Sequence, residues 1–68
     1  MMEAGWIKIF SSADFFKSEL VRQALIDHDI EAILINKQGF PYTIGEAEVY
    51  IHEENSHEAL RIINENEL

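Results

Sequence analysis

The chain has 68 residues, of which five are basic and thirteen acidic, with a formal net charge of −8 and no cysteine. This length allows one domain, residues 1–68, and the missing cysteines exclude disulfides and thiolate metal sites. The acidic balance argues against nucleic acid and anionic membranes as partners, because both require a basic surface. No apolar run has the length of a membrane span and no signal peptide is visible, so we expect a cytoplasmic domain.

The first predicted element is a strand over residues 6–10, where β-branched and aromatic residues alternate. Ile7 and Ile9 lie on one face of this strand, and Trp6, Lys8 and Phe10 lie on the other. Residues 11 and 12 are both serine and offer a hydroxyl N-cap for the element that follows.

A helix is predicted next, over residues 13–27. Spacings of three and four residues place one set of apolar side chains on a single helical face, which we expect to pack on a sheet. This set is Phe16, Leu20, Val21, Ala24 and Leu25.

Residues 30–36 predict a second strand, and its apolar run over residues 33–35 indicates either burial on both faces or cover by a loop. Residues 37–45 predict a loop, because two glycines and a proline interrupt them. Residues 46–52 alternate again and predict a third strand. Its inward side chains are Ala47, Val49 and Ile51, and its outward side chains are Glu48, Tyr50 and His52.

Two adjacent acidic residues, Glu53 and Glu54, open the last predicted helix, where the helix dipole stabilises negative charge. The apolar stripe of this helix comes from residues 59–63 and consists of Ala59, Leu60, Ile62 and Ile63. The predicted order is therefore strand, helix, strand, strand, helix.

This order predicts an α+β fold. A helix between the first two strands implies a right-handed crossover with those strands parallel, and the third strand fits between them. The result is a three-stranded sheet of antiparallel type in the order 1-3-2, with two helices on one face. Such a unit is a ferredoxin-like split βαβ arrangement without the usual last strand. The edge of the first strand is then expected to be open to pairing.

One face of the predicted sheet is left without helices, and it would carry three aromatic residues, which makes it a candidate contact surface. The loop over residues 37–45 adds two more aromatics, which either cover the end of the sheet or recognise a partner. The candidate partner-binding residues are Trp6, Lys8, Phe10, Lys37, Phe40, Tyr42 and Tyr50. The partner is either an unidentified protein or a second copy, which would pair through the open sheet face or the first-strand edge.

Several short segments resemble a small bacterial family of unknown function whose members are labelled prokaryotic signal-transducing proteins. The matching segments are WIKIFSS at 6–12, SELV at 18–21, IEA at 30–32, INK at 35–37, GEAEVYI at 45–51 and EE at 53–54. The resemblance implies the ferredoxin-like fold of the PII nitrogen-regulatory proteins, whose subunits form trimers that bind nucleotide. The loop corresponding to the PII regulatory loop, residues 36–45, is much shorter here and holds one basic residue, Lys37.

The sequence contains no arrangement typical of catalysis or of a metal centre. Ser11 and Ser12 lack a nucleophile elbow or a glycine-rich oxyanion motif, so we predict no catalytic residues. His52 and His57 are the nearest approach to a metal site, but zinc sites need three or four converging ligands, so we predict neither metal nor other cofactor.

These expectations favour a non-enzymatic binding or regulatory module that acts through protein contacts. Two alternatives remain open. One is a sensor of PII type that binds a nucleotide or small metabolite near Lys37, and the other is a metal-binding protein that uses His52 and His57.

Overall fold

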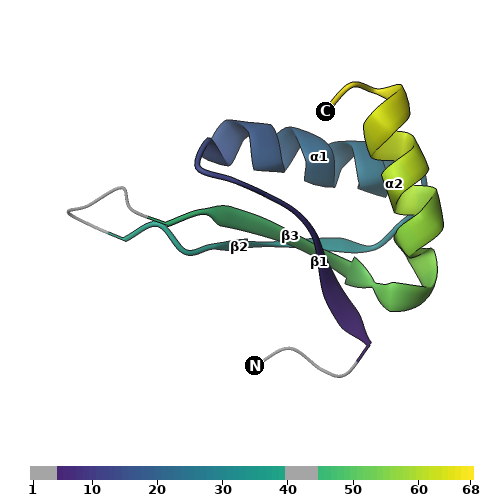
Figure 1. Ribbon diagram of the computed structural model, residues 1–68, viewed down its shortest axis with the longest axis horizontal. Helices are drawn as coiled ribbons and strands as arrows, with labels where there is room; N and C mark the ends of the chain where they lie inside the picture. Colours follow the sequence, from purple (N-terminus) through teal and green to yellow (C-terminus); the bar gives the residue numbers. More distant parts are fainter. Residues whose placement is uncertain (1–4, 40–44) are drawn as a thin grey trace.

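The computed structural model describes residues 5–39 and 45–68, and its elements follow the predicted order (Figure 1). They are β1 (Trp6–Ser12), α1 (Phe15–Asp27), β2 (Ala32–Asn36), β3 (Ala47–His52), the short 3₁₀ turn η1 (Glu53–Asn55) and α2 (Ser56–Glu65). The strands form one sheet in the order β1-β3-β2, and β3 is antiparallel to both neighbours. Both helices lie on the same side of this sheet. The predicted ferredoxin-like α+β fold is confirmed.

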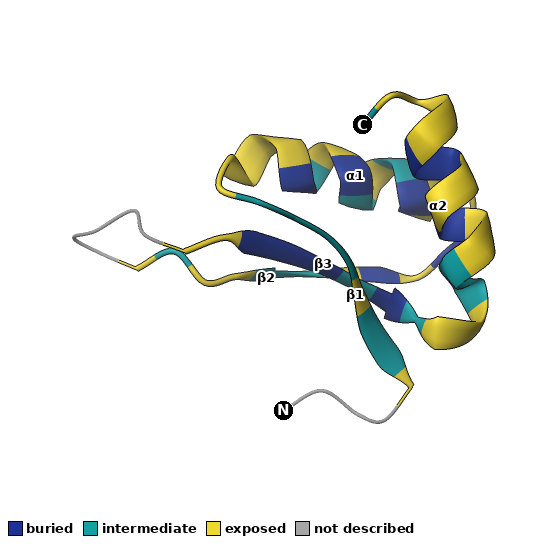
Figure 2. Ribbon diagram, viewed as in Figure 1, coloured by how far each residue is buried: buried dark blue, intermediate teal, exposed yellow. Residues whose placement is uncertain are grey.

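The core lies between the helices and the sheet, as the buried segments in Figure 2 show. The predicted inward residues of β3, Ala47, Val49 and Ile51, are completely buried. From the helix layer, Val21 and Leu25 of α1 and the buried stripe of α2 form one core cluster with Val49 and Ile51. In α2 this stripe consists of Ala59, Ile62 and Ile63, whereas Leu60, predicted to belong to it, is exposed.

The buried face of α1 differs from the predicted one. Ser18 is completely buried together with Val21 and Leu25, and its hydroxyl donates a hydrogen bond to the carbonyl oxygen of Ala47 at 2.7 Å. Phe16 and Leu20, which were expected in the core, are 70% and 48% exposed. The spacing of apolar residues alone does not reveal this face. A serine whose hydroxyl is hydrogen-bonded can be buried without a large cost in free energy.

The start of α1 also differs from the prediction. β1 continues through both serines, and Ser12 pairs with Ala47 of β3, so the helix begins at Phe15. Asp14 is the N-cap residue, and its Oδ1 accepts hydrogen bonds from the backbone N–H of Phe16 at 3.0 Å and of Lys17 at 3.4 Å. The Ser12 hydroxyl instead accepts from the Asp14 N–H at 3.0 Å. An aspartate cap satisfies two helix-end donors, which a serine within the strand cannot reach.

A β-bulge interrupts β1. Lys8 pairs with Tyr50 and Phe10 pairs with the next residue of β3, Val49, so Ile9 has no partner of its own. One extra residue reverses the alternation beyond it. Phe10 therefore lies on the helix-covered face and packs against the core, and the prediction that it shares a face with Trp6 and Lys8 is wrong.

β2 begins at Ala32, two residues later than predicted, and pairs with β3 without irregularity. Leu34 packs against the core, but Ile33 is exposed, so the first of the two alternatives for this strand, burial on both faces, is wrong. The second, cover by the loop, involves residues 40–44, which lie outside the described residues. None of the helices in the described ranges combines the length and apolar character that crossing a bilayer requires.

Candidate functional site

The sheet face opposite the helices is the candidate site, and we call it the open face. Strand partners share a face, so the registers of β1 and β2 on β3 define its members. The open face consists of the strand residues Trp6, Lys8, Ser11, Ile33, Ile35, Glu48, Tyr50 and His52, and of Glu31 and Lys37, which flank β2 and contact His52 and Glu48. Four of the predicted partner-binding residues, Trp6, Lys8, Lys37 and Tyr50, belong to it.

Glu48 lies at the centre of the polar part of the open face. Its Oε1 accepts a hydrogen bond from the Tyr50 hydroxyl at 2.9 Å and contacts the Lys37 Nζ at 3.1 Å. Its Oε2 accepts from the Lys8 Nζ at 3.4 Å. The Glu48 side chain is only 11% exposed. The structure therefore brings three predicted site residues, Lys8, Lys37 and Tyr50, together around one carboxylate.

These contacts change the ionisation of the groups that make them. The hydrogen bond from Tyr50 and the contact with Lys37 hold the pKa of the Glu48 carboxyl below its usual range, although partial desolvation acts the other way. The same carboxylate raises the pKa of Lys37. Lys37 is thus a charged but paired residue, which weakens the hypothesis that it binds an anionic metabolite.

A second cluster connects the three strands at the other end of the open face. The rings of Trp6 and His52 lie with centroids 3.9 Å apart and planes inclined by 35°. The His52 Nε2 contacts the Glu31 carboxylate at 2.6 Å. Glu31 precedes β2, so this cluster joins β1, β3 and the entry to β2 through side chains alone.

The base of the loop between β2 and β3 is held by several contacts. The Lys37 N–H donates to the Glu46 carbonyl oxygen at 3.0 Å, and the Gln38 N–H donates to the Asn36 side chain at 2.9 Å. The Gln38 amide also donates to the carbonyl oxygen of Ala13. The two aromatic candidates of this loop, Phe40 and Tyr42, lie outside the described residues.

The described part of the chain holds few groups that could serve a metal site or catalysis. No set of three or more histidine or acidic side chains converges there as a metal site would need, and His57 is exposed on α2. The Ser12 hydroxyl serves the backbone at the start of α1. An open depression beside His52 is lined by Gly5, His52, Glu53, Glu54 and Ser56.

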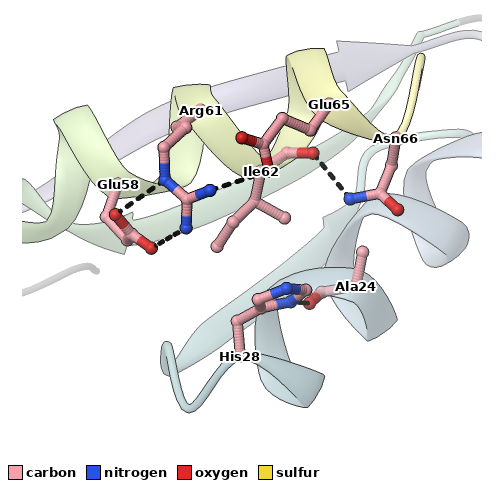
Figure 3. A network of polar contacts seen from close by, with 7 residues as sticks. All are labelled: Ala24, His28, Glu58, Arg61, Ile62, Glu65 and Asn66. Atoms are coloured by element: carbon pink, nitrogen blue, oxygen red, sulfur yellow. Dashed lines mark hydrogen bonds and ion pairs between the residues drawn. The ribbon is translucent and has the colours of Figure 1, made fainter.

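The helix layer carries its own polar contacts, which are local to each helix (Figure 3). Arg61 pairs with Glu58 and Glu65 along α2, and this lowers the pKa of Glu58 and raises that of Arg61. The His28 Nδ1 donates to the Ala24 carbonyl oxygen at 2.8 Å at the end of α1. Pairs at these spacings stabilise helices, so we assign them a structural role.

The sequence reasoning placed Glu48 on this face but missed its central role, and it assigned no role to Ile33 and Ile35. A signal for Glu48 is present: it lies between inward-facing Ala47 and Val49 and on the same side of β3 as Tyr50. A carboxylate in that position requires donors when it is buried.

Comparison with known proteins gave no match among family models, curated proteins or solved structures.

Proposed function

We propose that this chain is a non-enzymatic binding module with a regulatory role, and that it acts through protein contacts made by its open face. The observation that carries the proposal is the one-sided cover of the sheet. Both helices lie on one face, while the other presents Trp6, Tyr50 and the exposed Ile33. Aromatic and apolar side chains grouped on an uncovered face are characteristic of protein interfaces.

The charges on the open face support the same function. Lys8 and Lys37 are both paired with Glu48, and His52 is paired with Glu31. A protein that covers this face therefore buries ion pairs and not isolated charges, which lowers the cost of removing the face from water. A signalling role, which the family resemblance implies, needs contacts of this kind and no catalytic group.

The test compares one variant of the open face with one of the helix layer. Tyr50→Thr removes an aromatic ring from the open face and keeps a residue that favours strands. Phe16→Ser removes an exposed aromatic ring from α1 and serves as the matched control. Immobilised wild-type and variant chains are exposed to extract of the native host, and a protein retained by wild type and control is purified.

The purified protein is then titrated into the isotope-labelled chain and followed by NMR. We expect amide shifts in the strands, about tenfold weaker binding for Tyr50→Thr, and unchanged binding for Phe16→Ser. The proposal is contradicted if no retained protein depends on Tyr50, if both variants weaken binding equally, or if the shifts fall on the helices.

A further inference from the structure

The two outer strands of the sheet differ in how their free edges are protected. β1 carries two features that discourage edge pairing, the bulge at Ile9 and the exposed Lys8. β2 has neither: its sequence is AILIN, with no charge and no proline, and it pairs with β3 in an unbroken register. Both outer strands have a free edge, as predicted for the first strand, and the edge of β2 is the less protected of the two.

The backbone groups that β2 directs outward follow from its contact with β3. The Lys37 N–H donates to Glu46 on the β3 side. Because backbone groups alternate along an antiparallel ladder, those of Ala32, Leu34 and Asn36 point to the free edge. In the described part of the chain, no backbone hydrogen bond outside the helices and strands involves these three residues.

The side chains along this edge form a self-complementary row. The residues directed to the open face are, in chain order, Glu31, Ile33, Ile35 and Lys37, as the contacts of Glu31 with His52 and of Lys37 with Glu48 show. The row reads acidic, apolar, apolar, basic. Reversed, it becomes basic, apolar, apolar, acidic, so two antiparallel copies bring opposite charges together at both ends.

We infer that a second copy of this chain pairs with the β2 edge, antiparallel, with the two-fold axis at Leu34. Leu34 then lies opposite Leu34 of the second copy, Ile33 opposite Ile35, and Glu31 opposite Lys37. The outward groups of Ala32, Leu34 and Asn36 exchange about six backbone hydrogen bonds across the axis. Two three-stranded sheets become one six-stranded sheet with both helix layers on the same side.

Net charge opposes self-association in general, but among the possible contact surfaces it favours the β2 edge. Each copy carries a net charge of −8, so any interface that brings acidic residues together is opposed. β2 contains no charged residue, and the flanking Glu31 and Lys37 side chains are 69% and 56% exposed, so both can reach a facing strand. The inference goes beyond the proposed function and does not depend on it, because it concerns the edge of the sheet and not a partner on its face.

Disulfide capture tests the register, since the chain has no cysteine of its own. Ile33→Cys and Ile35→Cys chains are prepared separately, oxidised alone and oxidised as a mixture. Directly opposed residues at this kind of position lie about 4.5 Å apart between Cα atoms, within reach of a disulfide, whereas neighbours offset by two residues lie about 7–8 Å apart. We expect efficient cross-linking in the mixture and little in either chain alone.

Sedimentation of the wild-type chain tests the association itself. We expect twice the chain mass of 7.9 kDa at high concentration, and an approximately tenfold higher dissociation constant for Ile33→Lys, which places a charge next to the axis, opposite Ile35 of the second copy. Lys8→Ala, at the β1 edge, is the control and is expected to leave the constant unchanged. Circular dichroism verifies that each variant is folded.

The inference is overturned by a wild-type chain that stays monomeric up to millimolar concentration, by a cross-link as strong in either cysteine variant alone as in the mixture, or by a dimer unaffected by Ile33→Lys. A chain that is monomeric but accepts unrelated extended peptides along β2 also overturns it. If a variant fails to fold, hydrogen exchange of the wild-type Leu34 amide decides: protection that disappears on dilution supports the dimer, and its absence at high concentration refutes it.

Discussion

At the scale of single residues, Glu48 determines the character of the open face. Without it, Lys8 and Lys37 would make this end of the sheet a basic patch on an acidic protein. With it, the two lysines and the Tyr50 hydroxyl surround one carboxylate that is almost removed from water. Glu31, beside His52, adds a second negative charge that balances the two lysines. The face is therefore suited to cover by a protein surface more than to capture of a free anion.

From the Glu48 contacts we expect the free energy of unfolding to fall in acid. Because the pKa of Glu48 is lower in the folded chain than its ordinary value of 4.5, the folded chain binds fewer protons than the unfolded chain in this range. The stabilisation by the Glu48 contacts is complete when the pH is above the pKa of Glu48 in the unfolded chain. It is lost as the pH falls through the pKa of Glu48 in the folded chain. Glu48→Gln should therefore flatten the acid limb of stability against pH.

The measurement is chemical unfolding between about pH 7 and about pH 3 for the wild type, Glu48→Gln and Glu46→Gln. Glu19 and Glu58 also have lowered pKa values from their arginine partners, so part of the acid limb remains in every chain. Glu46→Gln is the control, and it should follow the wild type. Identical acid limbs for wild type and Glu48→Gln would show that the contacts do not stabilise the fold.

At the scale of elements, the sequence predicted the order of the strands and α-helices and the order of the strands in the sheet, because periodicity and turn residues set these features. It did not predict η1, which holds Glu53 and Glu54, the residues expected to open the last helix. The sequence did not predict which side of an element is buried where a single residue decides it. Ser18 is buried through a single hydrogen bond, and Ile9 adds one residue to β1. The first changes which side of α1 is buried, and the second moves Phe10 out of the candidate site. Neither event leaves a signal in apolar spacing.

Gly45 provides a prediction for the connection into β3. Its φ is +106°, and a Cβ atom there would lie 2.7 Å from the Lys37 carbonyl oxygen. Gly45→Ala should therefore destabilise the fold by about 2 kcal/mol or more, since both the backbone conformation and the contact are unfavourable. Gly5→Ala is the matched control, because Gly5 has φ +99° with no heavy atom within 4 Å of the added Cβ.

Unfolding free energies of the two glycine variants separate the two causes. The Gly5→Ala variant should lose only the part due to backbone conformation, about 1 kcal/mol. An equal loss in both would mean that Lys37 and Gly45 move apart at little cost, so that the strand connection is not fixed by this contact.

At the scale of the whole molecule, charge is unevenly paired. Both arginines and two of the three lysines form ion pairs with acidic residues, but five basic residues cannot balance thirteen acidic ones, and the net charge stays at −8. Neither helix has a basic residue in its last turn, where one would be favourable. Self-repulsion therefore opposes folding across the molecule, and exposed ion pairs recover little of it.

We expect added sodium chloride to raise the melting temperature of the monomer, because screening weakens this repulsion more than it weakens exposed ion pairs. The measurement is thermal unfolding in dilute solution, where the chain is monomeric, over a range of salt concentrations. A melting temperature that falls with salt would instead show that the ion pairs of Glu19, Glu48 and Glu58 dominate.

The bulge at Ile9 also affects how this chain is compared with others. A relative whose first strand is regular would align with it only if a one-residue gap were placed inside the strand, at Ile9. Alignments that forbid gaps within strands would shift the segment before the bulge by one position. Trp6 and Lys8 would then be matched to residues of the opposite face, and an interface shared between two such proteins would look unrelated in sequence.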